Sequence, residues 1–225
     1  ALNPQITKNY ANGNIQEMEK LTYLGIKFSY IILFFLAFPL SLNINYVLQL
    51  WLVEVPDYTA LFIILIMIDS LVGNLFGVPL MTSLSSTGKI RNYQIVVSFI
   101  ILLIVPVGYV ALRLGCNAPS VFYITIIFSG LSGFVRFLFC RKQIGYSLRA
   151  MTKSVLLPVT CMTLVALPLP IFAKLEYFKT DTFMNFLLFC LISIVMTFVS
   201  AWFVGLNATE KGKLLSIIKS KIHKG

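Results

Sequence analysis

This sequence of 225 residues contains little of what soluble proteins and enzymes depend on. Charged side chains make up only 12% of it, against about 25% in a typical soluble domain. It has a single histidine, His223, and its four cysteines are scattered with no close pair, which supports neither a disulfide framework nor a metal site. No carboxylate pair lies within one apolar run, and there is no Gly-x-Ser-x-Gly motif or Cys/His cluster. We therefore expect no catalytic residues, no metal and no cofactor.

The sequence instead contains long runs of apolar residues. Its hydrophobic content is 58%, and nearly every apolar residue falls into one of six runs, at about 26–50, 58–80, 93–112, 119–140, 154–173 and 183–205. A helix needs about 20 apolar residues to cross roughly 30 Å of hydrocarbon. The runs are continuous rather than alternating, which is typical of helices and not of barrel strands. The sequence therefore predicts an all-α membrane protein with a bundle of six transmembrane helices.

The positive charges are divided unevenly between the two sides of such a bundle. One side carries 14 lysines and arginines, in residues 8–27, 89–91, 141–153 and 211–224, while the other side carries 3. Because cytoplasmic loops carry the excess of Lys and Arg, we predict that both ends of the chain face the cytoplasm. Topology and contact with the lipid bilayer account for the net charge of +10, so we expect no nucleic-acid partner.

The same alternation divides the chain into five segments. They are a cytoplasmic amphipathic lead-in helix at 1–25, four transmembrane helices at 26–140, a basic cytoplasmic connection at 141–153, two transmembrane helices at 154–205 and a basic cytoplasmic tail at 206–225. The turn Asn12-Gly13-Asn14 precedes the lead-in helix, where Asn14 and Glu17 are spaced as a capping box. The tail is either solvated or attached to anionic lipid.

The stretch Thr87-Gly88-Lys89 resembles the end of a phosphate-binding P-loop. That motif needs a glycine five residues before Gly88 and a Ser or Thr after the lysine. This sequence has Ser83 and Ile90 at those positions. We therefore interpret "TGKIRNYQ" as a short cytoplasmic turn between the second and third spans.

Four polar side chains within the runs are candidates for binding a substrate or ion: Lys27, Asp69, Asn74 and Arg136. Asp69 is the only carboxylate deep in a run. A carboxylate there costs about 2.5–3.5 kcal/mol on insertion scales, so it should face protein or a wet cavity. Asp69 is either a proton or cation site, with Ser70 and Asn74 nearby, or a partner in a helix–helix hydrogen bond.

The two cations lie near the cytoplasmic ends of their runs. Lys27 and Arg136 either snorkel to the lipid headgroups or ring a cavity that attracts an anionic headgroup. Gly73 and Gly77 form a Gly-x-x-x-Gly motif, which predicts close helix packing at that point.

Four stretches resemble, in order, segments of bacterial polysaccharide flippases. They are "NPQITKNYANGNIQEMEKL", "VLQLWLVEVPDYTALF", "STGKIRNYQI" and "VPVGYVALRLGCNAPSVFYI". The matching family features are a turn before an amphipathic helix, a Trp-Leu-x-x-x-Pro-x-Tyr turn, a Thr-Gly-Lys-Ile hairpin, and a Pro-x-x-Tyr then Leu-Gly-x-x-Pro pattern. They cover most of residues 3–158 with matching topology. The sequence is similar to O-antigen and capsular polysaccharide flippases (Wzx-type) of the multidrug/oligosaccharidyl-lipid/polysaccharide exporter superfamily.

The resemblance implies a carrier that moves undecaprenyl-pyrophosphate-linked oligosaccharide across the bacterial inner membrane for O-antigen or capsular polysaccharide synthesis. Such carriers have twelve to fourteen spans in two lobes, so this chain is expected to be the C-terminal part of one. Its partners would be the lipid-linked oligosaccharide, the bilayer, and the polysaccharide polymerase and chain-length regulator. Two alternatives stay open: a cation-coupled multidrug exporter of the same superfamily, which Asp69 would suit, and a membrane glycan polymerase or acyltransferase.

The charge distribution predicts that Gly88 faces the cytoplasm, whereas residues 51–57 and 174–181 face the periplasm. Gly88→Cys and Glu54→Cys are introduced singly into a background without the native cysteines. An impermeant thiol reagent added to intact cells should label only the Glu54→Cys variant, because the charge-rich turn stays inside. Permeabilised cells, in which both should react, provide the control. Labelling of Gly88→Cys but not of Glu54→Cys from outside would overturn the topology.

Overall fold

The structure, a computed structural model, describes residues 2–168, 183–207 and 210–212. Within these residues the regular elements are all helices. Six stretches are long and apolar enough to cross a membrane: Ile15–Leu42, Thr59–Ser86, Arg91–Arg113, Pro119–Ile144, Leu148–Ala166 and Phe183–Gly205. The prediction of an all-α membrane protein with six spans is therefore confirmed.

The chain divides into two compact units, Ala1–Val155 and Leu156–Gly225. The first contains α1 (Asn3–Ala11), α2 (Ile15–Leu42), α3 (Ile44–Trp51), α4 (Thr59–Leu75), α5 (Val78–Ser86), α6 (Arg91–Leu102), α7 (Ile104–Arg113), α8 (Pro119–Ile144) and α9 (Leu148–Met151). The second contains α10 (Leu157–Ala166), α12 (Phe183–Ser200) and the π-helical turn η2 (Ala201–Gly205), and a further π-helical turn, η1 (Thr152–Leu156), joins the two units along the chain.

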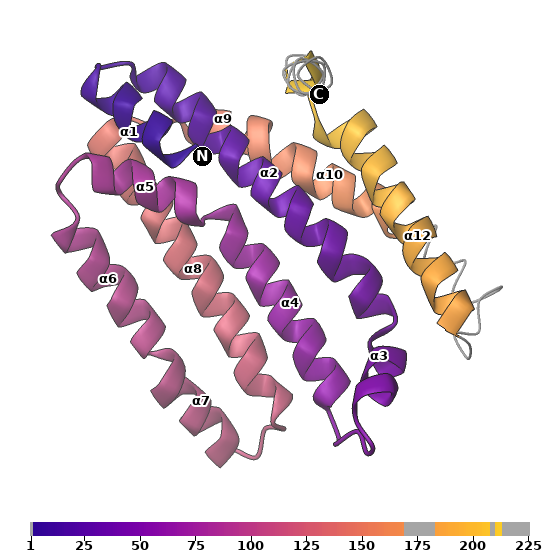
Figure 1. The fold of residues 1–225 in the computed structure, drawn as a ribbon. Coiled ribbons are helices and arrows are strands. Elements are labelled where there is room, and N and C mark those ends of the chain that lie inside the picture. The colour runs from indigo at the N-terminus through magenta and orange to yellow at the C-terminus, as the bar shows by residue number, and fades with distance from the viewer. Residues whose placement is uncertain (1, 169–182, 208–209, 213–225) are drawn as a thin grey trace. The chain divides into compact units, whose positions relative to one another are not determined.

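The second and third spans are each interrupted four residues before a proline. Proline has no N–H to donate to the carbonyl four residues earlier, and its ring clashes with that carbonyl. Pro79 would have donated to Leu75, where α4 ends, and Pro106 would have donated to Leu102, where α6 ends. In Figure 1 the chain bends between α4 and α5 and between α6 and α7. The positions of these bends therefore follow directly from the sequence.

The first span ends at Leu42, past a proline, Pro39, inside α2. Asn43 lies between α2 and α3, and its side-chain amide donates a hydrogen bond of 3.2 Å to the carbonyl of Pro39. This bond supplies a side-chain partner for a carbonyl at the end of α2. Asn43 is 1% exposed, so the amide acts inside the protein rather than at its surface.

The lead-in segment differs from the prediction in its first residues. Gly13 turns the chain with a φ of +73°, and α2 begins at Ile15 as the capping residues predicted. The side chain of Asn14 makes no capping hydrogen bond, however, and Glu17 forms an ion pair of 2.7 Å with Lys20 instead. Residues before the turn form a separate helix, α1, which buries Ile6 completely.

The fourth span, α8, runs in the same direction as the second span and packs along its length. Near one end, the ring of Phe122 stacks on Phe62 of α4 with centroids 4.7 Å apart. Further along, Gly133 leaves room for Phe76: a Cβ on Gly133 would lie 2.6 Å from the Cβ of Phe76. Close helix approach at a small residue is the usual way in which membrane helices pack, and it brings the backbone of α8 against the bend in the second span.

The predicted Gly-x-x-x-Gly packing motif was wrong. A Cβ added to Gly73 would meet no atom within 4 Å, and the three atoms nearest to one added to Gly77 belong to residues 73 and 74 of the same span. The packing glycine is Gly133, on the partner helix. A motif of two glycines shows that close approach is sterically possible, but not which face of the helix meets a neighbour.

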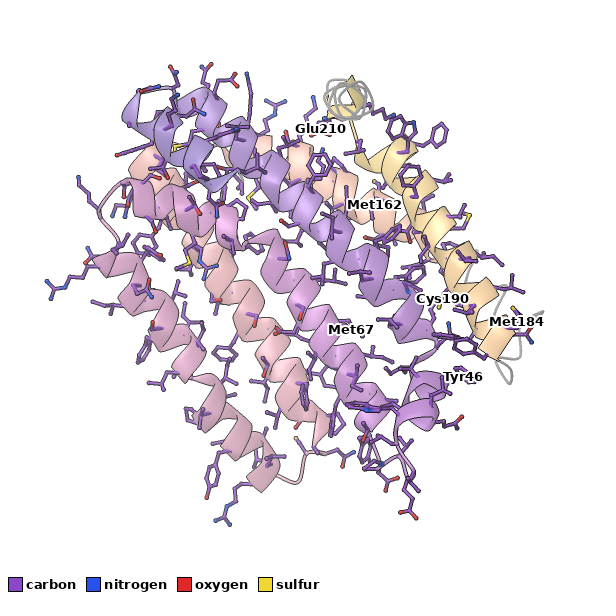
Figure 2. The ribbon with its side chains drawn as sticks, in the orientation of Figure 1. Tyr46, Met67, Met162, Met184, Cys190 and Glu210 are labelled. Carbon is purple, nitrogen blue, oxygen red and sulfur yellow. The ribbon has the colours of Figure 1, made fainter. Side chains whose placement is uncertain are left out.

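The third span faces outward along most of its length. Figure 2 shows its side chains projecting from α6 and α7, and Phe99, Leu102 and Val105 are 60%, 66% and 71% exposed. In water such a surface would be unstable, but a helix of mean hydropathy 2.8 loses nothing when its side chains meet lipid tails. Such exposure of apolar side chains is expected for a helix that faces lipid.

The basic connection at 141–153 is mostly helical rather than extended. The fourth span continues to Ile144, Gly145 ends it with a φ of +90°, and α9 begins at Leu148. Tyr146 in the short link is 1% exposed. The polar connection therefore contains a fully buried side chain, that of Tyr146.

In the second unit, α10 and the last span are joined by a polar contact. The hydroxyl of Ser200 donates a hydrogen bond of 2.7 Å to the carbonyl of Met162. Gly205 lies against the same residue, because a Cβ there would approach the Met162 sulfur to 3.3 Å. The predicted outer segment at 174–181 and most of the basic tail lie outside the described residues.

Replacement of Gly133 tests the contact between α8 and the bend. We expect Gly133→Ala to destabilise the protein by about 1–3 kcal/mol, because overpacking forces side chains or backbone to move. The matched control is Gly73→Ala, where the new methyl group meets open space and alanine is the better helix former. Thermal unfolding of the two variants in detergent is the measurement. Equal melting temperatures for both variants would show that the close approach does not limit stability.

Candidate functional site

The bend in the second span leaves backbone groups without helical partners. Pro79 cannot donate to the carbonyl of Leu75, and the N–H of Leu80 bonds to Gly77, three residues back, at 3.2 Å. The carbonyl of Phe76 therefore accepts no backbone hydrogen bond. In hydrocarbon, an unsatisfied backbone group costs several kcal/mol. A donor from another part of the protein is required at this point.

Arg136 supplies that donor from α8. Its Nη1 lies 2.7 Å from the Phe76 carbonyl oxygen. The end of α4 also carries the negative end of the helix dipole, which favours a cation beside it. The Nε of the same guanidinium is buried and has no hydrogen-bond partner. Arg136 is thus directed toward backbone inside the bundle, which neither simple snorkelling nor an open cavity rim predicts.

A second donor follows one helical turn later. The thiol of Cys140 is buried and lies 3.7 Å from the carbonyl oxygen of Leu80. Gly133, Arg136 and Cys140 are spaced three and four residues apart, so they form one face of α8. Along this face, Gly133 makes room for Phe76, and Arg136 and Cys140 donate to carbonyls on either side of the bend. These contacts hold the second span in its bent form.

Asp69 lies on α4, before the bend, and is half-buried. Its Oδ1 is buried without a hydrogen-bond partner, and no ion pair joins it to Arg136 within the described residues. The predicted neighbours do not gather around it, because Ser70 is exposed and the side chain of Asn74 makes no hydrogen bond to any described residue. The helix–helix hydrogen bond considered for Asp69 is therefore not formed in this structure.

Lys27 is enclosed by protein rather than extended to the headgroups. It is 1% exposed, so the snorkelling expectation was wrong for this side chain. Lys27 lies on α2, two residues after Gly25, whose Cβ position would be 3.1 Å from the Pro79 ring. The close approach of α2 to α5 at this glycine brings the first span beside the bend.

Sequence reasoning missed a buried cluster of three hydroxyl groups. Thr22 on α2, Ser83 on α5 and Tyr146 after α8 are 0%, 0% and 1% exposed. Their oxygens lie 2.9 Å (Thr22–Ser83), 3.0 Å (Thr22–Tyr146) and 2.9 Å (Tyr146–Ser83) apart. Thr22 and Ser83 are also within hydrogen-bonding distance of the carbonyls of Met18 and Pro79. The three hydroxyls thus join α2, α5 and the link after α8 at one end of the first unit.

The acid–base state of this cluster is constant over physiological pH. Burial raises the pKa of the Tyr146 phenol to about 12, so the hydroxyl keeps the proton that it donates. A neighbouring carboxylate adds a second layer, since Glu19 accepts hydrogen bonds of 2.8 Å from the Tyr23 hydroxyl and from the Ser147 backbone N–H. The only sequence signal for this site was the Tyr146 side chain inside a polar stretch.

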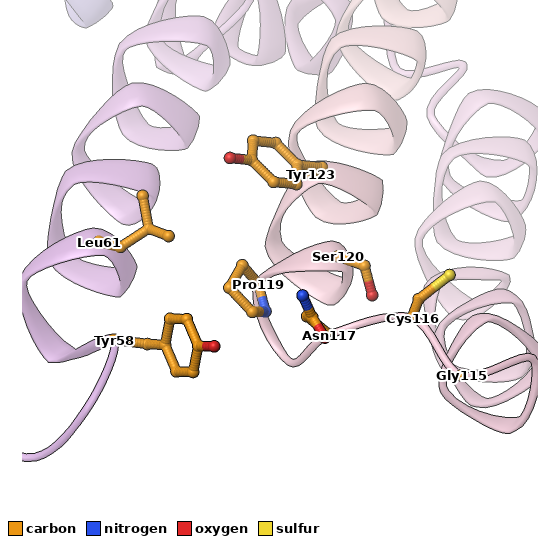
Figure 3. Close-up of a pocket in the computed structure, with 8 residues that line it drawn as sticks. All are labelled: Tyr58, Leu61, Gly115, Cys116, Asn117, Pro119, Ser120 and Tyr123. Atoms are coloured by element: carbon orange, nitrogen blue, oxygen red, sulfur yellow. The ribbon is translucent and has the colours of Figure 1, made fainter.

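A shallow pocket of about 500 Å³ lies at the opposite end of the unit (Figure 3). Tyr58 and Tyr123 flank it, Asn117 comes from the connection before α8, and Ser120 comes from the first turn of α8. The Ser120 hydroxyl oxygen is buried without a partner, and Tyr58 has a φ of +63°, which is uncommon for a residue other than glycine. Aromatic rings are enriched where a span meets the membrane–water interface, and this pocket lies at such an end of the second and fourth spans.

Removal of one hydroxyl tests the buried cluster. We expect Tyr146→Phe to lower stability by about 1–3 kcal/mol, because Thr22 and Ser83 lose a buried partner. Tyr123→Phe is the control, since Tyr123 is 50% exposed. In the wild type the phenol's contribution should be complete below pH 10, the ordinary tyrosine pKa, and lost as the pH rises through about 12. Denaturation in detergent at pH 7 is the measurement; identical curves for both variants would contradict the cluster's role.

No protein-family model, no curated protein and no solved structure matches this chain. The arguments for its function therefore come from its own residues and their geometry. Within the described part of the chain, these are a membrane-spanning helix bent at a proline and a cation held at the bend.

Proposed function

We propose that this chain is the C-terminal part of a polysaccharide flippase that carries undecaprenyl-pyrophosphate-linked oligosaccharide across the bacterial inner membrane. The ordered resemblance of four sequence stretches is the first support. The membrane fold, the single histidine and the lack of a carboxylate pair within any one apolar run agree with a carrier rather than an enzyme. In this proposal, both ends of the chain lie in the cytoplasm.

The observation that supports transport most directly is the interrupted second span with Arg136 at its bend. Discontinuous helices near the middle of the membrane are a common way in which transporters build substrate and ion sites. The bend at Phe76 and Gly77 lies about ten residues from the end of the span at Ser86, or roughly 15 Å at 1.5 Å per residue. A cation at that depth is a functional-site hypothesis by default.

In the proposed mechanism, Arg136 attracts the pyrophosphate of the lipid carrier. Its guanidinium has five donors, and the Phe76 carbonyl uses Nη1, so further N–H groups remain for an anion. Attraction between opposite charges is stronger in a cavity of intermediate dielectric than in water. Lys27, buried on the neighbouring helix α2, is the second candidate cation.

One observation favours the alternative of a cation-coupled exporter. Asp69 has a buried carboxylate oxygen without a partner, near the middle of the second span. An intramembrane carboxylate of this kind is typical of proton relays in pumps and transporters. In a flippase, the same residue would serve coupling or helix contact, because it would repel the pyrophosphate if it were ionised and unpaired.

Substitutions at Arg136 in the complete parent protein separate anion attraction from helix stabilisation. Arg136→Lys keeps the charge and a donor, Arg136→Gln keeps a donor for Phe76 without charge, and Arg136→Ala removes both. In a flippase-null host, we expect surface polysaccharide to be largely retained with Lys and lost by about tenfold or more with Gln and Ala. Membrane abundance, measured by immunoblot, should be similar for the Lys and Gln variants.

Three results would count against this proposal. Full transport by Arg136→Gln would show that Arg136 serves only as the hydrogen-bond donor to the Phe76 carbonyl at the bend. Failure of the parent protein to restore surface polysaccharide would remove the flippase assignment itself. If Asp69→Asn instead abolished resistance to a cationic drug while polysaccharide stayed unchanged, the exporter would be the better description.

A further inference from the structure

The end of the first unit that is predicted to be cytoplasmic contains a polar cavity that the proposed transport path does not use. Its volume is about 290 Å³, roughly the share of ten water molecules in the liquid. The lining residues include Tyr10 of α1, Lys89 after α5, Asn92 of α6, and Phe139, Lys142 and Gln143 of α8. Three segments that are distant in sequence, α1, the turn from α5 into α6, and α8, thus meet around one small space.

The wall formed by the turn after α5 is held in place by hydrogen bonds. Gln143 donates from Nε2 to the carbonyl of Lys89 at 3.2 Å and accepts from the Thr87 hydroxyl at 3.0 Å. The Lys89 N–H lies 3.1 Å from the same Thr87 oxygen. Gly88 between them has a φ of +71°, which only glycine adopts without strain. The turn is therefore fixed to α8, with Lys89 and Lys142 lining the same space.

The chemistry of the cavity favours an anion with several oxygens. Two lysines line it, and no carboxylate does. Tyr10 and Asn92 also line it, and their side chains make no hydrogen bond to any described residue, so the hydroxyl and the amide remain available as donors. Ammonium, amide and hydroxyl donors together fit the oxygens of a phosphate group. Because the lysines lie on different elements, the cavity concentrates charge that neither segment would provide alone.

Apolar side chains lead from this cavity along the lipid-facing surface. Ile95 and Phe99 follow Asn92 at three and seven residues on α6 and are 57% and 60% exposed. Leu138 precedes Lys142 by four residues on α8 and is 40% exposed. Residues at these spacings share a helix face. A molecule with its anionic group in the cavity would therefore find an apolar path for its chains directly below.

We propose that this cavity binds the phosphate headgroup of an anionic membrane phospholipid, with its acyl chains along α6 and α8. Basic pockets between membrane helices on the cytoplasmic side are suited to such headgroups. The bound lipid would tie α1, the turn after α5, and α8 together. This site stands apart from the bend in the second span, so it does not depend on whether the parent protein is a flippase.

Lipid titration of the full chain in a neutral detergent tests the site. The probe is acyl-labelled phosphatidylglycerol, and the competitors are unlabelled phosphatidylglycerol, phosphatidylcholine and inorganic phosphate. We expect K89Q/K142Q to weaken binding of the probe by about tenfold or more. The matched control, R91Q/R141Q, removes two charges from nearby positions on α6 and α8, which do not line the cavity, and should change binding by less than about twofold.

The outcomes separate the possible ligands. Selective weakening in K89Q/K142Q, with competition by phosphatidylglycerol only and an unchanged melting temperature, supports the lipid site. Equal weakening in both double variants would reduce the effect to general surface charge and overturn the proposal. Complete displacement of the probe by millimolar inorganic phosphate would also overturn it, because the ligand would then be free phosphate.

Discussion

The structure depends on one constraint: a helix interrupted inside a membrane must find new partners for its backbone groups. Hydrocarbon provides none, so the bend that Pro79 imposes on the second span is stable only where another helix brings donors to it. The face of α8 that carries Gly133, Arg136 and Cys140 does so, with a contact of 2.7 Å from Arg136 to the Phe76 carbonyl. Gly133 permits the close approach of the two helices, and that approach brings Arg136 within hydrogen-bonding distance of the Phe76 carbonyl. The hydrogen bond therefore depends on the packing.

The two ends of the bent span are held differently. Beyond the bend, α5 is anchored by the buried hydroxyls of Thr22, Ser83 and Tyr146, and the turn that follows it is tied to Gln143. Before the bend, α4 packs mainly through apolar contacts such as the stacked rings of Phe62 and Phe122. Directional hydrogen bonds resist sliding more than apolar contacts do. In the proposed transport cycle, movement would therefore be easier for α4 than for α5.

Much of the architecture was predictable because it is local. Continuous apolar runs require helices in a membrane, so the six spans and the all-α class followed from composition. The ends of α4 and α6 follow equally from Pro79 and Pro106, each of which denies a donor to the carbonyl four residues before it. The start of α2 followed from the turn at Gly13. None of these features needs knowledge of a neighbouring helix.

Contacts between helices were not predictable in the same way. A hydrophobic run shows no preferred face when every side is apolar, so the sequence identified Gly73 and Gly77 as a packing motif although Gly133 makes the close contact. It placed Lys27 either at the headgroups or at a cavity rim, although that side chain is buried, and it left Tyr146 inside a polar connection. By itself the sequence determined how many helices span the membrane and, at Pro79 and Pro106, where two of them are interrupted. Only the tertiary structure decided which polar groups meet, because partners for buried donors and acceptors come from segments that are distant along the chain.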